Sequence, residues 1–86
     1  MLFKNTIKIL DLSKEKDIDI YVAKNLCLSK NDSINNNNVN KAYEFIIKYY
    51  TFITKCRINN NISDIEKLCI LYENNDYEGI NKFIKM

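Results

Sequence analysis

The apolar residues between Val39 and Arg57 recur at steps of three and four, which constrains the fold more than any other feature of this sequence. This spacing places them on one face of a helix about five turns long. A second series follows the same steps and widens the apolar face: Phe45, Tyr49, Phe52 and Cys56. One neighbouring helix does not cover so wide a face. We therefore expect a central helix with helices on two sides, or with one aromatic side kept for a partner chain.

Polar turn residues divide the rest of the C-terminal half into two shorter helices. The cluster 59–61 suits a turn because Asn tolerates left-handed backbone angles, and Ser63 and Glu66 then form a capping-box pattern. The sequence predicts a helix near 64–74 that starts at this capping box.

A last helix is predicted near 77–85, after a turn at Asn74 and Asn75. Asp76 is placed to cap it. Gly79 weakens it by about 0.5 to 1 kcal/mol relative to alanine, and marks either a close helix crossing or a helix kept in place by packing. The two short helices are expected to form a helical hairpin.

The first third of the chain has two interpretations. Residues 6–10 and 17–22 alternate with period two, so a β-hairpin across 11–16 is an alternative to helices. Helices are favoured because Asp17 is a good N-cap residue and apolar residues follow it at helical spacing. The Asn-rich segment at about 31–38 is expected to be an exposed, mobile loop.

Together these patterns predict one small all-α domain spanning residues 1–86, a compact bundle of four to five helices around the long central one. The alternative is an α+β fold with an N-terminal β-hairpin. A chain of 86 residues with 47% apolar residues is long enough for one core.

The sequence has too few kinds of reactive side chain for most enzyme classes. The sequence has no histidine, no proline and one glycine, which removes imidazole chemistry and Gly-rich phosphate loops. Cys27, Cys56 and Cys69 form no Cys-x-x-Cys pair and are expected to be buried thiols. Cys56, beside Lys55 and Arg57, is the least poor candidate for a nucleophile. We predict no catalytic residue, no metal, no cofactor and no enzymatic activity.

The composition and the thiols predict the cellular compartment of the protein. No apolar run of 18 residues and no secretory leader is present, and three free thiols suit a reducing compartment, so we predict a cytoplasmic protein without membrane contact. Fourteen Asn, fourteen Ile and twelve Lys against one Arg are typical of an AT-rich genome. Small size and this bias suggest a phage or mobile-element protein.

A basic stripe supports one candidate function. Lys41, Lys48 and Lys55 are spaced by sevens and share nearly one helix face, with Arg57 beyond them. Such a stripe can follow phosphates, so a nucleic-acid-binding or transcriptional regulatory domain is the alternative hypothesis. The net charge of +2 is small for a dedicated DNA-binding domain. An ordinary solvated face is the favoured explanation of the stripe, because Glu44 and Lys48 form an i, i+4 pair on it.

Aromatic and acidic residues support the leading hypothesis, a small binding protein. Tyr and Phe supply contact area with few rotors, and acidic residues near the C-terminus favour a basic partner. The predicted partner-binding residues are Phe45, Tyr49, Phe52, Glu73, Asp76 and Glu78. We predict an inhibitor or adaptor that acts on a larger protein. The example of such a target is a host defence system such as CRISPR. A homodimer formed through the aromatic helix face is a further hypothesis.

Overall fold

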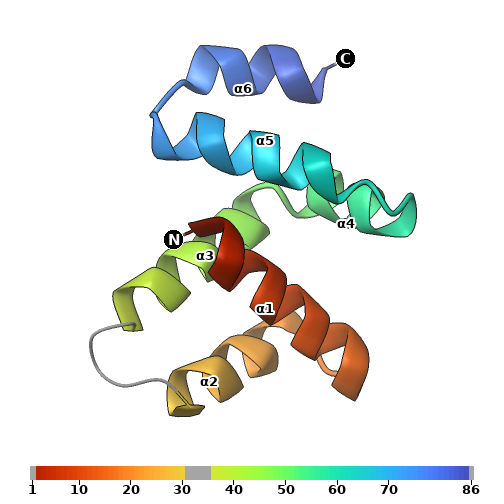
Figure 1. Ribbon diagram of the computed structural model, residues 1–86, viewed down its shortest axis with the longest axis vertical. Helices are drawn as coiled ribbons and strands as arrows, with labels where there is room; N and C mark the ends of the chain where they lie inside the picture. Colours follow the sequence, from red (N-terminus) through yellow and green to blue (C-terminus); the bar gives the residue numbers. More distant parts are fainter. Residues whose placement is uncertain (1, 31–35, 86) are drawn as a thin grey trace. The chain divides into compact units, whose positions relative to one another are not determined.

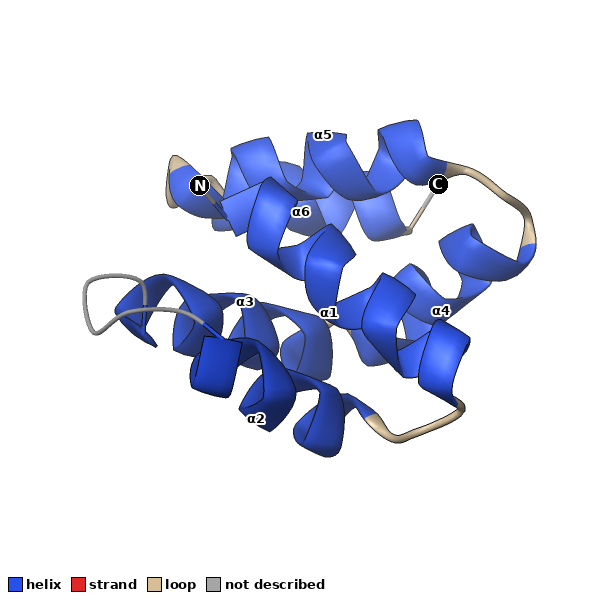
Figure 2. Ribbon diagram, turned by 60° about the horizontal axis from the view of Figure 1, so that its bottom comes forward, coloured by secondary structure: helices blue, strands red, loops and turns tan. Residues whose placement is uncertain are grey.

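A computed structural model describes residues 2–30 and 36–85, and these form six helices and no strand (Figure 1; Figure 2). The all-α prediction is confirmed. The β-hairpin alternative is wrong, because residues 6–10 lie within helix α1 (Leu2–Lys16) and residues 20–22 open helix α2 (Ile20–Lys30). Contacts divide the chain into two compact units, Met1–Lys48 (unit 1) and Tyr49–Met86 (unit 2). That the whole chain is a single domain stays a prediction.

Unit 1 consists of α1, α2 and α3 (Asn36–Lys48), each of which contacts the other two. Helix α1 buries Leu2, Thr6, Ile9 and Leu10, which recur at steps of one helical face. The one buried polar side chain among them, Thr6, donates its hydroxyl to the Leu2 carbonyl at 2.7 Å, so its burial leaves no orphaned hydroxyl. The buried residues of the other two helices are Ala23, Cys27, Val39, Ala42, Phe45 and Ile46.

Unit 2 consists of α4 (Tyr50–Ile58), α5 (Ile62–Glu73) and α6 (Tyr77–Ile84), and α5 contacts both of the others. The buried residues of these helices are Ile53, Cys56, Ile65, Leu68, Cys69 and Ile80. Two ring pairs add to this core: Tyr49 and Tyr72 meet edge-on at 5.9 Å, and Phe52 and Phe83 meet at 5.4 Å between centroids. The predicted hairpin of two C-terminal helices is therefore present.

Three helix ends share one backbone motif. Asp17, Asn60 and Asn75 have φ angles of 54°, 56° and 57°, the left-handed region that Asp and Asn tolerate better than other side chains. In each case the next amide donates to the carbonyl five residues earlier, as in a Schellman motif. These bonds are Ile18 to Ser13 at 3.0 Å, Asn61 to Cys56 at 2.7 Å and Asp76 to Leu71 at 3.0 Å. A chain with one glycine thus turns three times on Asp and Asn, as predicted for the two asparagine clusters.

The predicted helix of residues 39–57 is wrong in two respects. It is interrupted at Tyr49, whose φ of −116° and ψ of 34° separate α3 from α4. It also begins earlier than predicted, because α3 includes residues 36–38 of the segment expected to be a loop. The rest of that predicted loop, residues 31–35, lies outside the described residues.

Two of the three predicted helix starts are also corrected. Asp17 ends α1 rather than capping α2; the Asp19 carboxylate accepts from the Val22 amide at 2.9 Å instead. Helix α5 begins at Ile62, so Ser63 lies inside its first turn and forms no capping box. The third start is confirmed: the Asp76 carboxylate accepts from the Gly79 amide at 3.0 Å at the start of α6.

Candidate functional site

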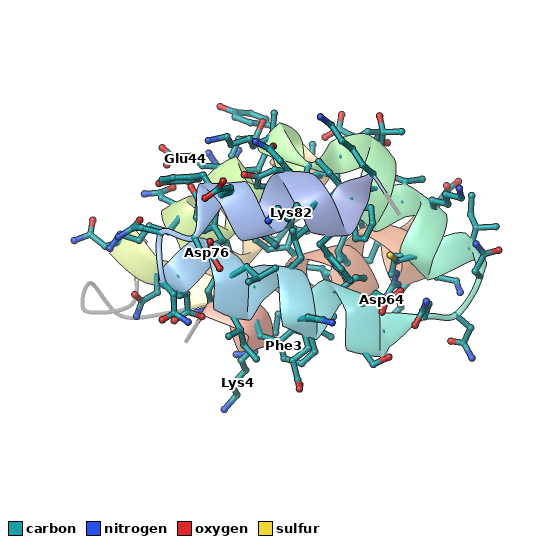
Figure 3. All side chains as sticks on the ribbon, turned by 90° about the horizontal axis from the view of Figure 1, so that it is seen from above. Phe3, Lys4, Glu44, Asp64, Asp76 and Lys82 are labelled. Atoms are coloured by element: carbon teal, nitrogen blue, oxygen red, sulfur yellow. The ribbon has the colours of Figure 1, made fainter. Side chains whose placement is uncertain are left out.

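The end of the α5–α6 hairpin carries exposed apolar and acidic side chains together. Ile70 is 53% exposed and Tyr77 is 49% exposed, although both are large hydrophobic residues. They lie within one helical turn of the 74–76 connection, as do the exposed Glu73, Asp76 and Glu78. Figure 3 shows Asp76 at this end of the hairpin and Asp64 at the other. We call these five residues the acidic tip.

Two hydrogen bonds fix the backbone and the ring at the acidic tip. Asp76 accepts from the Gly79 amide, and the Tyr77 hydroxyl donates to the Asn75 side-chain carbonyl at 3.2 Å. Asp76 therefore has a structural role as a helix cap beside its charge. Glu73 and Glu78 are exposed, and Glu78 lies in the first turn of α6, where its charge complements the helix dipole.

The predicted aromatic residues divide between core and surface. Phe45 is fully buried, so its ring belongs to the core of unit 1. Tyr49 and Phe52 are half-buried, with their rings against Tyr72 and Phe83. Burial, followed by the nearby hydroxyls of Tyr72 and Tyr77, raises the pKa of Tyr49 above its ordinary value. Contact of Tyr49 and Phe52 with a partner protein stays a prediction.

The predicted basic stripe is divided between two helices. Lys41 and Lys48 lie on α3, whereas Lys55 and Arg57 lie on α4, beyond the interruption at Tyr49. The three lysines are exposed and Arg57 is half-buried. Because a common face requires one continuous helix, the spacing by sevens no longer places Lys55 on the face that carries Lys41 and Lys48. Nucleic-acid binding by these residues stays a prediction.

The three cysteines are buried free thiols, as their apolar neighbours predicted. Burial and then the Asp64 carboxylate raise the pKa of Cys56 above its ordinary value, and the smaller opposing effect of Lys55 does not reverse this. A thiol in that state is mostly protonated at neutral pH and is a poor nucleophile. Among residues 2–30 and 36–85, no group of three His, Cys, Asp or Glu side chains is placed to hold a metal ion.

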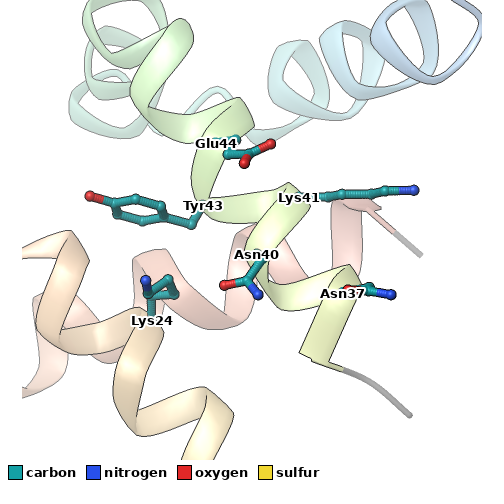
Figure 4. Close-up of a pocket in the computed structure, with 6 residues that line it drawn as sticks. All are labelled: Lys24, Asn37, Asn40, Lys41, Tyr43 and Glu44. Atoms are coloured by element: carbon teal, nitrogen blue, oxygen red, sulfur yellow. The ribbon is translucent and has the colours of Figure 1, made fainter. Parts of the chain in front are cut away.

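A second surface, which the sequence patterns missed, lies between α2 and α3 of unit 1. A pocket of about 510 Å³ is lined by Lys24 of α2 and by residues of α3: Asn37, Asn40, Lys41, Tyr43 and Glu44 (Figure 4). We call it the α2–α3 pocket. The only sequence signal for it is that Asn37, Asn40, Lys41 and Glu44 fall at i, i+3, i+4 and i+7, which puts four polar residues on one helix face.

Two tyrosine rings contact Lys24, one of the two lysines that line this pocket. The Lys24 ammonium lies 4.5 Å from the centroid of the Tyr21 ring and 4.7 Å from that of Tyr43. The rings themselves meet edge-on, with centroids 6.0 Å apart at 67°. Each cation–π contact at a partly exposed site contributes about 0.5 to 1 kcal/mol. Lys24 is thereby restricted to one region of the surface although its side chain is long.

Comparison with protein-family models, with curated proteins and with solved structures found no match to this chain. Within the described part of the chain, every helix is too short or too polar to cross a lipid bilayer. The residues and their geometry therefore carry the functional argument.

Proposed function

We propose that this chain is a small non-enzymatic binding module, an inhibitor or adaptor that docks its acidic tip on a basic, concave surface of a larger protein. The observation that carries the proposal is the exposure of Ile70 and Tyr77 at the same end of the hairpin as three exposed carboxylates. Scattered exposed apolar residues are ordinary, but a tyrosine and an isoleucine beside a turn give a partner two anchors at one end of a hairpin.

The charge of the acidic tip supports a basic partner. Residues 68–81 contain Glu73, Asp76 and Glu78 and no Lys or Arg, so this segment carries three negative charges and no positive one. Complementary charge accelerates encounter and selects the partner more than it tightens binding. Binding strength then comes mostly from burial of Ile70 and Tyr77.

The shape of the acidic tip supports a concave partner surface. The tip is the end of two helices joined by a tight turn, so it is convex, and a groove or channel surrounds it better than a flat surface. The Schellman motif at Asn75, the Asp76 cap and the hydroxyl bond of Tyr77 hold this end in one conformation. A preordered tip loses less conformational entropy on binding than a flexible loop.

The non-enzymatic part of the proposal rests on the thiols. Among the side chains that serve as nucleophiles, cysteine is the strongest, and Cys27, Cys56 and Cys69 are all buried. The raised pKa of Cys56 keeps its sulfur protonated.

The proposal is tested by photo-crosslinking from position 77 of the full chain in the cells that produce it. A photoreactive amino acid replaces Tyr77, and the matched control places it at Ile58, a more exposed hydrophobic residue of unit 2 outside the acidic tip, at 79% exposed. We expect one defined protein product from position 77 and none from position 58. Equal products from both positions would show that exposure alone causes the crosslink and would overturn the proposal.

A charge-neutral variant separates charge from folding in the same experiment. The triple change Glu73→Gln, Asp76→Asn and Glu78→Gln removes three charges but keeps the shapes, and Asn remains a good N-cap. We expect unchanged circular dichroism and at least about a tenfold weaker crosslink at low salt, because three charges near a basic surface contribute together. A triple variant that crosslinks as well as the parent would contradict the basic partner.

A further inference from the structure

We propose that the α2–α3 pocket of unit 1 binds a nucleoside phosphate, either a free mononucleotide or the end of a single strand. The site lies in a different unit from the acidic tip and rests on different residues, so it stands or fails independently of the proposed docking function. Its lining combines the groups that such a ligand needs: cations, amides, one carboxylate and one aromatic ring.

The cations of the pocket select an anion. Lys24 and Lys41 contribute two positive charges to the lining and Glu44 one negative charge. Lys24 is held by the rings of Tyr21 and Tyr43 at 4.5 and 4.7 Å, so a ligand that binds its ammonium does not have to order a freely rotating chain. An ammonium group placed in this way donates charge-assisted hydrogen bonds to phosphate oxygens.

The remaining polar groups make a bare anion a poor fit. The Glu44 carboxylate accepts hydrogen bonds and repels other anions, so the ligand must also carry donors such as sugar hydroxyls. Asn37 and Asn40 each offer a carbonyl acceptor and an NH₂ donor, which match the edge of a nucleobase or a sugar. Figure 4 shows Lys24 and Tyr43 on one side of Asn40 and Lys41 extending on the other, with Glu44 above them in this view.

The size and the aromatic side chain of the pocket fit the same ligand class. A volume of about 510 Å³ is within the usual range for small-molecule pockets and leaves room for a base, a sugar and a phosphate. Tyr43 is half-buried and adds an aromatic side chain to the lining, which suits a ligand that has both an apolar ring and polar groups. An apolar ligand is disfavoured because it would cover two ammonium groups and two amides without hydrogen bonds.

The test is a nuclear magnetic resonance titration of the isotope-labelled full chain with adenosine 5′-monophosphate. Parallel arms use adenosine, inorganic phosphate and a short 5′-phosphorylated oligoadenylate. We expect the nucleotide to shift the amide signals of residues 24 and 37–44, with a dissociation constant of about 1 mM or below. Tighter binding of the oligonucleotide would assign the pocket to a strand end, and equal binding would assign it to free nucleotides.

Charge-neutral variants test whether the pocket itself binds. Lys24→Gln and Lys41→Gln are each expected to weaken binding about tenfold, because each removes a charge-assisted hydrogen bond. The matched control is Lys8→Gln, an exposed lysine on α1 of the same unit that does not line the pocket. Equal weakening by the control, equal affinity for adenosine or for inorganic phosphate, or no shift with any probe would overturn the proposal.

Discussion

Replacement of Gly79 by alanine tests how the acidic tip is built, because this glycine lies directly over the cap of α6. Glycine in a helix costs about 1 kcal/mol relative to alanine, so the substitution ordinarily stabilises a helix. A methyl group added here would lie 2.5 Å from Oδ2 of Asp76 and 2.8 Å from its Cγ, closer than nonbonded atoms approach. The methyl group therefore displaces the carboxylate that accepts from the Gly79 amide.

The two effects are similar in size and opposite in sign. Loss of an Asp cap costs about 1 kcal/mol, within a range of about 0.5 to 2. Gly79→Ala in the parent chain should therefore change the free energy of unfolding by less than about 0.5 kcal/mol, as the propensity gain and the cap loss offset each other. In an Asp76→Ala background no carboxylate remains to displace, so the same substitution should stabilise by about 1 kcal/mol.

The assay is a double-mutant cycle by urea unfolding, followed by circular dichroism, with hydrogen exchange of the residue 79 and 80 amides as a local measurement. The expected coupling between the two positions is about 1 kcal/mol. Asp76→Asn is the control, because asparagine retains both the cap and the obstruction, and Gly79→Ala should behave there as in the parent chain. If Gly79→Ala raised the free energy of unfolding by about 1 kcal/mol in the parent, Asp76→Ala and Asp76→Asn backgrounds alike, the substitutions would be additive. That result would refute the displacement of the Asp76 carboxylate.

Three further predictions follow from the turns, the thiols and the lysines. Asn60→Ala should destabilise the chain by about 1 kcal/mol while Asn60→Gly does not, because φ is 56° there; equal unfolding midpoints for both would contradict this. Because the pKa of Cys56 is raised in the folded state, the unfolded chain loses this proton first. The free energy of unfolding should therefore be unaffected at neutral pH and fall above the ordinary thiol pKa of 9.0, and Cys56→Ala should flatten that fall, as measured by urea titrations at several pH values. If the basic residues bind nucleic acid, fluorescence anisotropy should show an affinity that drops steeply between about 50 and 200 mM salt and weakens further in Lys48→Gln; absence of binding at low salt removes that alternative.

Local chemistry made the two asparagine turns and the start of the last helix predictable from the sequence. Asn60 and Asn75 occupy left-handed positions that few other residues tolerate, and Asp76 caps the helix it precedes. These features depend on neighbours a few residues away, which the sequence shows directly. Of the two predicted caps that were wrong, Asp17 is replaced by Asp19 two residues later, a residue of the same chemistry. Ser63 is the second residue of α5, and Asn61, which precedes this helix, makes no side-chain capping hydrogen bond.

The interruption at Tyr49 had no comparable signal. No glycine or proline stands near it, and the apolar period continues from Ile46 through Tyr50 to Ile53. The φ and ψ angles of Tyr49 are accessible to any residue, so no special side chain is needed. Contacts separate into two units at this residue, and a boundary set by contacts between distant segments is not encoded in local periodicity.

The start of α3 is a second place where tertiary packing overrides the local sequence, here by extending a helix and not by interrupting one. Asn has a low helix propensity, by about 0.7 kcal/mol per residue relative to alanine, so a run of asparagines favours a loop. Residues 36–38 are nevertheless helical, because Val39 and Ala42 are buried in unit 1, where α3 packs on α1 and α2, and the helix that carries them extends back by a turn. Asn37, once helical, joins Asn40, Lys41 and Glu44 on one face and completes the wall of the α2–α3 pocket.

The candidate sites therefore differ in how far the sequence could reveal them. The acidic tip is formed by residues within nine positions of one another, so its charge was visible in the sequence and only the exposure of Ile70 and Tyr77 was added by the fold. The α2–α3 pocket requires Tyr21 and Lys24 to meet Tyr43, about twenty positions later, across two packed helices. Such a pairing is fixed by tertiary contacts, so no local sequence pattern shows it. The ligand proposal depends most on Lys24, the lysine that both rings contact.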